Sequence, residues 1–107
     1  MNEATAIDAF ASISNVTRLR MLKMLVQAGS AGMNAGEIAK RAGATPSRAS
    51  FHLANLAQAS LITAEKQSRQ ITYRANFHAL GAVVRYLVED CCGNDPKVRD
   101  CCGPKLI

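Results

Sequence analysis

Apolar residues recur every three or four positions over most of this 107-residue chain. That spacing is typical of amphipathic helices, whose apolar side chains line one face. It predicts helices over Thr5–Ser14, Val16–Ala28, Ala35–Ala42 and Phe77–Asp90, with a further helix after Thr45. Asn15 and Asn34 precede two of these helices and are good N-caps, because an asparagine side chain can accept hydrogen bonds from the first free backbone N–H groups.

The stretch from Gly36 to Ile62 is predicted to form two helices joined by a tight turn. Gly43 can adopt the left-handed dihedral angles that end a helix, and Thr45 can cap the next one. Pro46 then falls at the first helical position, where its missing N–H costs nothing. The start of the second helix is therefore fixed by its own sequence.

The two faces of that second helix differ in character. The stripe predicted to be buried recurs at three- and four-residue spacing and consists of Ala49, Leu53, Leu56 and Ala57. The opposite, leading face carries Pro46, Ser47, Arg48, Ser50 and Phe51. A short capped helix with an exposed Ser/Arg-rich first turn fits the major groove of DNA.

Beyond this helix the pattern changes to two short β-compatible runs, Leu61–Lys66 and Ile71–Ala75, separated by the polar segment Gln67–Gln70. A polar turn between such runs predicts a β-hairpin, whose turn type stays open because Asn-Gly and Asp-Gly are absent. After Asp90 the periodicity ends in a Gly/Pro/Cys tail that we expect to be irregular. The predicted fold is mainly α with a small β-hairpin (α+β), in the order ααααββα.

Apolar stripes on the long helices indicate where the core lies. The predicted core stripe consists of Val16, Leu19, Leu22, Leu25 and Val26 in the second helix, and of Leu80, Val83, Val84, Leu87 and Val88 in the last. The first and last helices carry more apolar surface than one small core needs, so we expect them to pack against a second subunit. The chain is then a homodimer of one domain, residues 1–90, with a tail of residues 91–107.

Composition and charge narrow the range of partners. Apolar residues make up 49% of the chain, yet no run is long enough for a membrane span and no signal sequence is evident, so we expect a soluble, cytoplasmic protein. The net charge is +5, and up to Arg85 ten Lys/Arg residues stand against four Asp/Glu. A cationic body suits a polyanion such as DNA. No catalytic constellation emerges, so an enzyme is not expected.

All four cysteines lie in the tail, as the adjacent pairs Cys91/Cys92 and Cys101/Cys102. In a reducing compartment they favour thiol chemistry over disulfides. Adjacent cysteines wrap a tetrahedral ion poorly, whereas As(III) or Sb(III) needs only three thiolates in a pyramid. The Gly/Asn/Pro segment between the pairs can turn the chain back, so that the second pair supplies a third sulfur.

Two motifs carry a resemblance to a known family. Residues 45–56, Thr-Pro-Ser-Arg-Ala-Ser-Phe-His-Leu-Ala-Asn-Leu, look like the recognition-helix signature of the ArsR/SmtB family of bacterial metal-responsive winged-helix repressors. Residues 15–22, Asn-Val-Thr-Arg-Leu-Arg-Met-Leu, resemble that family's signature at the start of its second helix. The match runs from Ile7 to Val88 with the order of elements intact. It implies a homodimeric winged helix-turn-helix repressor that binds operator DNA.

In a winged-helix protein the recognition helix and the hairpin, called the wing, contact DNA. The candidate contacts are Thr45, Ser47, Arg48, Ser50, Phe51 and His52 on the helix and Lys66, Arg69 and Arg74 on the wing. We expect the serines and the arginine of the helix to contact base edges or phosphates, and the wing cations to contact phosphates or the minor groove. His52 fits either a hydrogen-bonded structural histidine or a phosphate contact.

The chain departs from two metal-site patterns of the family that it resembles. Many relatives carry a Cys-x-Cys pattern before the recognition helix, but the corresponding stretch, Met33–Ile38, has no cysteine. Others carry Asp/His/Glu zinc ligands along the last helix, where this chain has only His78, Glu89 and Asp90 in a different arrangement. The tail is similar instead to relatives that sense arsenite through a C-terminal cysteine cluster. The candidate ligands are Cys91, Cys92, Cys101 and Cys102.

We therefore expect a repressor of a metalloid-resistance operon that arsenite or antimonite releases from its operator, with no small organic ligand. Three alternatives use the same cysteines. They are a response to Cd(II) or Zn(II), redox or sulfide sensing through a disulfide or persulfide, and metal storage or delivery on a DNA-binding scaffold. An arsenate reductase is disfavoured, because nothing beside the cysteines resembles an oxyanion-binding loop.

Overall fold

The computed structural model describes residues 1–102, and the side chains of residues 1–99. Its helices are α1 (Glu3–Ile13), α2 (Val16–Ala28), α3 (Ala35–Ala42), α4 (Pro46–Gln58), α5 (Phe77–Arg85) and α6 (Pro96–Cys102). Its strands are β1 (Met33–Asn34), β2 (Ile62–Gln67) and β3 (Gln70–Ala75). A 3-10 turn, η1 (Gly29–Ala31), follows α2, and a π-helical segment, η2 (Tyr86–Cys91), continues α5.

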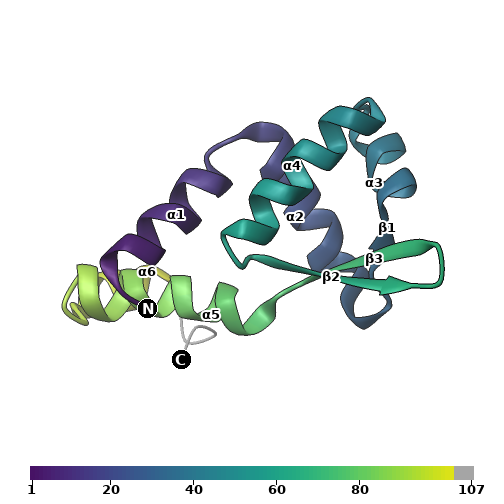
Figure 1. Cartoon of the computed structure of the whole chain (residues 1–107). Helices are drawn as coiled ribbons and strands as arrows, with labels where there is room; N and C mark the ends of the chain where they lie inside the picture. The colour runs from purple at the N-terminus through teal and green to yellow at the C-terminus, as the bar shows by residue number, and fades with distance from the viewer. Residues whose placement is uncertain (103–107) are drawn as a thin grey trace.

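Helix α4 lies at the centre of the fold and packs against α1, α2 and α3 (Figure 1). The β-hairpin extends from its end, and β3 packs on α2. Helix α5 then leaves β3 and returns toward the start of α1 (Figure 1). This is a winged helix-turn-helix, and the predicted order of four helices, a hairpin and a helix is confirmed. Among the described helices, none is both long and apolar enough to cross a membrane.

Side-chain caps start the helices where the sequence predicted them. Asn15 accepts hydrogen bonds from the backbone N–H groups of Thr17 and Arg18 at 2.9 and 3.0 Å, and Asn34 accepts one from that of Glu37 at 2.8 Å. The first helix differs slightly, since it begins at Glu3 under an Asn2 cap and not at Thr5. Local capping chemistry therefore sets the boundaries of α2 and α3.

The turn between α3 and α4 also has the predicted form. Gly43 ends α3 at φ 65° and ψ 31°, which is the left-handed conformation. Two residues later the Thr45 hydroxyl accepts a hydrogen bond from the Arg48 N–H at 3.3 Å, and Pro46 is the first residue of α4. Three local features within residues 43–46 thus fix the turn of the helix-turn-helix: a left-handed glycine, a threonine cap and a proline at the first helical position.

The sheet has three antiparallel strands in the order β1-β3-β2. Gln67 pairs with Gln70, so the hairpin turn has two residues, Ser68 and Arg69, and is tighter than the four-residue turn predicted. Ser68 takes the positive φ of 57° that such a turn requires. Strand β1 was not predicted, because a two-residue strand exists only by pairing with β3.

The core is narrower than the predicted stripes. Leu22 and Leu25 of α2 are buried, but Val16, Leu19 and Val26 are 61%, 51% and 40% exposed, so their assignment to the core was wrong for the single chain. Met21 is fully buried in their place. The face of α2 that packs inward is therefore rotated relative to the predicted stripe. The whole buried cluster consists of Ala9, Met21, Leu22, Leu25, Met33, Ile38, Ala39, Ala49, Leu53, Leu56, Leu61, Ile62, Ala75 and Val83.

The last helix departs from its predicted stripe in the same way. Of its five apolar residues only Val83 is buried, while Val84 and Leu87 are exposed. The α-helix also ends at Arg85, and the π-helical segment η2 continues the turn to Cys91. The prediction of a continuous α-helix to Asp90 was thus wrong. Most of the apolar face of α5 and η2 is not covered by the other described residues.

As far as the structure describes it, up to Cys102, the tail is not irregular, contrary to the prediction. Gly93 and Asn94 both take positive φ, 60° and 61°, and reverse the chain after η2. The Asp95 side chain then accepts a hydrogen bond from the Lys97 N–H at 2.8 Å, and Pro96 is the first residue of α6. An aspartate followed by a proline is typical of a helix start. This signal was overlooked because the Gly/Pro-rich composition indicated an irregular segment.

Gly32 gives the first test of the fold. A Cβ placed there would lie 2.5 Å from the Tyr73 carbonyl oxygen, because β1 must approach β3 closely, whereas a Cβ at Gly43 would meet nothing within 4 Å. Both glycines have positive φ, so both alanine variants carry backbone strain. We expect Gly32→Ala to lower the free energy of unfolding by about 1–3 kcal/mol more than Gly43→Ala, measured by urea denaturation. Equal losses would show that β1 does not pack as described.

Candidate nucleic-acid interface

Helix α4 presents the predicted DNA-contacting residues together. Ala49, Leu53 and Leu56 are buried and hold the helix on the core. The other side is open: Thr45, Ser47, Arg48, Ser50 and Phe51 are all exposed. Phe51 is 65% exposed, which is unusual for so large an apolar side chain. The first two turns of α4 therefore form an accessible surface with hydroxyl, guanidinium and aromatic groups.

His52 lies at the edge of this surface and is half-buried. Its Nδ1 is 3.2 Å from a guanidinium nitrogen of Arg18, and its ring meets Phe51 edge to face, with centroids 5.5 Å apart. A guanidinium can only donate, so Nδ1 is the acceptor and the ring proton sits on Nε2. The structural role predicted for His52, a hydrogen-bonded histidine, matches this contact.

The environment of His52 favours its neutral form. Burial lowers the pKa of His52 below its usual value of 6.5, and the positive charges of Arg18 and Arg48 lower it further. A neutral ring is also what the Arg18 contact requires, because a protonated imidazole has no acceptor nitrogen. The lowered pKa, which is caused first by burial, and the Arg18 contact therefore both favour the neutral ring.

The wing carries the remaining candidate cations in two different settings. Lys66 and Arg69 are exposed, one near the end of β2 and one in the turn. Arg74 lies toward the other end of β3, where its Nε donates to the Ser30 carbonyl at 2.8 Å and a terminal nitrogen lies 3.8 Å from the Glu65 carboxylate. The wing tip therefore offers two exposed cations. Arg74 ties the wing to η1, and its predicted contact with DNA stays a prediction.

The cysteines lie at or beyond the end of the α5–η2 segment that is farther from β3. Cys91 is exposed at the end of η2, and Cys92 follows, with its N–H donating to the Leu87 carbonyl at 3.1 Å. Cys101 and Cys102 end α6, but their side chains lie outside the described residues. Among the described side chains, no three of the types His, Cys, Asp and Glu gather closely enough to hold a metal ion.

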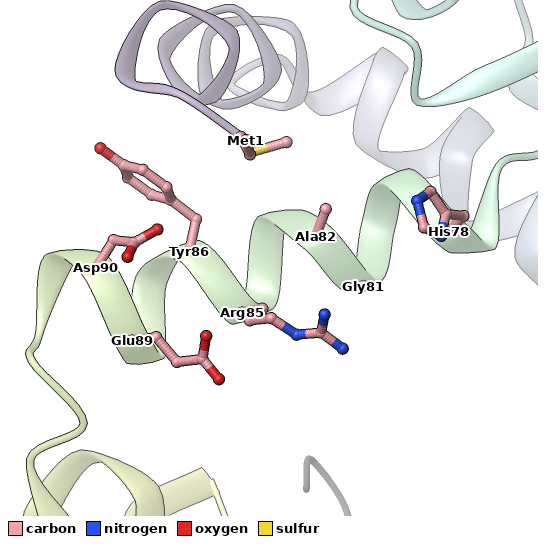
Figure 2. Close-up of a pocket in the computed structure, with 8 residues that line it drawn as sticks. All are labelled: Met1, His78, Gly81, Ala82, Arg85, Tyr86, Glu89 and Asp90. Carbon is pink, nitrogen blue, oxygen red and sulfur yellow. The ribbon is translucent and has the colours of Figure 1, made fainter.

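A groove of about 360 Å³ runs along one face of α5 and η2. Figure 2 shows Met1 over this face, near Ala82 and Tyr86, so the N-terminus of the chain faces, across the groove, the helix that leads to the cysteines. His78 stands at one end of the groove, and Glu89 and Asp90 stand at the other (Figure 2). Among the described side chains these three residues therefore do not gather at one point of the groove.

Comparison with known proteins agrees with this architecture. A helix-turn-helix domain family model matches residues 13–65. An ArsR-like transcriptional regulator from Rhodococcus sp. RHA1 is 28% identical with a TM-score of 0.74, over 89% of this chain and 87% of that one. The chain contains a helix-turn-helix domain and is similar in sequence and structure to ArsR-like transcriptional regulators. Helix-turn-helix regulators of this kind act by binding DNA and are not enzymes.

Two further solved structures are similar to this chain. A protein described as a possible transcriptional regulator for arsenical resistance is 28% identical with a TM-score of 0.65, over 78% of this chain and 82% of that one. A homodimeric winged helix-turn-helix domain from Mycobacterium bovis shares the fold at 20% identity, with a TM-score of 0.67, over 90% of this chain and 85% of that one. No curated protein sequence matches the chain.

Three residues around the interface were not recognised from the sequence. No role of its own was predicted for Arg18, Ser12 or Asn55. The structure joins all three to His52 through side-chain and backbone hydrogen bonds. These contacts link positions 34 and 43 residues apart, and apolar periodicity carries no signal for them.

The lowered pKa of His52 predicts a pH dependence of stability. Near pH 6 the unfolded chain binds more protons at this residue than the folded protein does. The free energy of unfolding should therefore fall as the pH drops below 6.5, and this contribution should level off below the folded pKa. Urea denaturation between about pH 5 and pH 7.5 measures it. His52→Asn should flatten the slope, and the matched variant His78→Asn should keep it; an unchanged slope in His52→Asn would contradict the assignment.

Proposed function

We propose that this chain is a homodimeric repressor of a metalloid-resistance operon, acting in the cytoplasm. Arsenite or antimonite would release it from its operator by binding tail thiolates. The observation that carries the proposal is the presence of two features in one chain. One is the exposed Ser/Arg surface on α4, and the other is the exposed Cys91 thiol at the end of η2. The arsenical-resistance relative, at 28% identity, supports the choice of inducer class.

DNA binding would use α4 in the major groove. Arg48 is the cation that α4 exposes in its first turn, and a guanidinium there can hold a guanine edge or a phosphate with two hydrogen bonds. Ser47 and Ser50 flank it with hydroxyl groups that donate or accept. Lys66 and Arg69 at the wing tip would neutralise flanking phosphates, which fixes position but not sequence.

Dimerisation would cover the apolar side chains that the single chain leaves exposed. Ile7 on α1 is 59% exposed, and Val84 and Leu87 on the last helix are 36% and 41% exposed. Met1, two residues before α1, lines the groove on α5 and η2, so the start of the chain lies beside the helix that carries Val84 and Leu87. The homodimeric relative from Mycobacterium bovis has the same fold. A two-fold dimer would present two α4 helices to the two halves of a pseudo-palindromic operator.

Inducer binding would use Cys91 and Cys92 with a third sulfur from Cys101 or Cys102. Soft thiolates select thiophilic ions, and trivalent arsenic or antimony is satisfied by three of them. The positive φ of Gly93 and Asn94 turns the chain back toward η2, which supports closure by the second pair. Cd(II) or Zn(II) with the same sulfurs, and a redox or sulfide signal, are the rival inducers.

The role of Arg48 can be tested with a DNA fragment selected from a random-sequence library. Arg48→Ala should weaken binding by about 1–3 kcal/mol in a fluorescence anisotropy titration, because one direct DNA contact is lost. The matched control is Arg20→Ala, which removes the same charge from an exposed position of α2, outside α4 and the wing. If both variants bind as the wild type does, α4 does not contact DNA through Arg48.

The inducer can be tested with cysteine variants in reducing buffer. Arsenite should release the wild-type protein from its operator, with a coupling of about 1–3 kcal/mol. Cys91→Ser/Cys92→Ser should bind the operator normally and ignore arsenite. Met24→Leu, which removes a sulfur that is not a thiol, should respond like the wild type. Release of the double cysteine variant by arsenite would contradict the tail site.

Mass spectrometry separates the rival inducers. An arsenic adduct on the reduced wild-type protein supports metalloid sensing, provided that no species shows the mass loss of two hydrogen atoms that marks a disulfide. A disulfide or an added sulfur after oxidant or sulfide treatment, with no arsenic adduct in reducing buffer, would favour the redox or sulfide alternative.

A further inference from the structure

One polar cluster joins three helices behind the DNA-contacting surface. Among the described residues, Ser12 is the one polar side chain classed as buried, at 3% exposure. Its hydroxyl donates to the Asn55 side-chain oxygen at 2.7 Å, which links α1 to α4. A buried hydroxyl without a partner costs free energy, so this hydrogen bond constrains how the two helices meet.

Arg18 supplies a second link between the same helices. Its Nε donates to the Ser12 carbonyl at 2.6 Å, and a terminal nitrogen donates to His52 Nδ1 at 3.2 Å. Ser12 lies in the last turn of α1, where backbone carbonyls have no partner within the helix. A guanidinium at that end satisfies a carbonyl and complements the negative end of the helix dipole.

The geometry of the guanidinium makes this link rigid. Its N–H groups diverge in one plane, so two acceptors on opposite sides must keep a fixed distance and angle. One acceptor is the end of α1, and the other is on α4. His52 and Asn55 are three residues apart on α4 and therefore lie on one side of it, facing this junction. Two hydrogen-bonded links thus fix α4 against α1.

Polar groups dominate the open side of this junction. A groove of about 540 Å³ opens there and is lined by Asp8, Ala11, Ser12, Arg18, Asn55, Gln58 and Ala59. Most of these side chains are polar, whereas Ala9 of α1 shares the apolar core with the buried stripe of α4. Directional hydrogen bonds therefore add to apolar packing in setting the angle between α1 and α4.

We propose that Arg18 is a positioning residue for operator recognition, which holds α4 at its DNA-binding angle by joining the end of α1 to His52. The proposal rests on the operator binding described above. Arg18 itself need not contact DNA. Its effect runs through Nδ1 of His52, four residues after Arg48 and so on the same side of α4.

Arg18→Lys tests the proposal, because it keeps the positive charge and removes the diverging N–H donors of the guanidinium group. We expect operator affinity to fall by about 10- to 100-fold, as for loss of a charge-assisted hydrogen bond. Affinity for unrelated DNA should stay within about twofold, because that binding depends on charge. Arg20→Lys is the matched control on an exposed position of the same helix and should bind as the wild type does.

Two substitutions of His52 separate positioning from direct contact. His52→Asn keeps an acceptor close to the place of Nδ1, whereas His52→Gln moves its amide toward the place of Nε2. Positioning through Nδ1 predicts that Asn retains operator affinity and that Gln loses as much as Arg18→Lys. The double variant Arg18→Lys/His52→Gln should lose no more than either single variant, because both remove the same contact.

Several outcomes would overturn the positioning role alone. One is a folded Arg18→Lys protein that binds the operator as tightly as the wild type; another is full additivity in the double variant. A His52→Gln variant that binds better than His52→Asn would also overturn it, and this comparison stands even if Arg18→Lys fails to fold. A wild-type protein that selects no operator would instead refute the proposed function.

Discussion

The structure depends on the burial of one face of α4. Leu53 and Leu56 are completely buried, and the core that receives them includes Leu25 and Ile38 from α2 and α3. Each such side chain contributes about 1.5–3 kcal/mol relative to an exposed one, so rotation of α4 about its axis is strongly opposed. That constraint is what holds Arg48 and the serines outward. Burial fixes which face of α4 is exposed, and the hydrogen bonds of Ser12 and Arg18 further constrain the angle of α4 against α1.

Elements that depend on neighbours in sequence were predictable. The caps Asn15, Asn34 and Thr45 and the left-handed Gly43 act within three or four residues, and all were predicted at the positions where the structure has them. The exposed face of α4 followed because the stripe of Ala49, Leu53 and Leu56 lies opposite it. Features with a local physical cause can be derived from the sequence in this protein.

Features that depend on distant partners were not predictable. Strand β1 exists because Met33 pairs with Tyr73, and nothing in a two-residue stretch signals that pairing. Val16 and Leu19 have the spacing of core residues but are exposed, because periodicity shows that a face is apolar without showing what covers it. The hydrogen bonds of Arg18 to His52 and of Arg74 to Ser30 were missed because they also join residues far apart in the sequence. The sequence showed only that both side chains are positively charged, whereas the structure shows both as hydrogen-bond donors within the fold.

Helix α1 connects the two ends of the molecule that the proposed function requires. Just before its start, Met1 lines one groove with Ala82 and Tyr86, and Tyr86 begins the π-helical segment that ends at Cys91. At its end, Ser12 meets both Asn55 and Arg18. An eleven-residue helix is about 16 Å long and moves as one body, so a shift at one end is carried to the other. A π-helical turn has one more residue per hydrogen-bonded ring than an α-helical turn, and its rearrangement would displace the face of α5 and η2 that Met1 lines. Under the proposed function, inducer binding at Cys91 would then be relayed to α4 through α1 and the hydrogen bonds of Ser12 and Arg18.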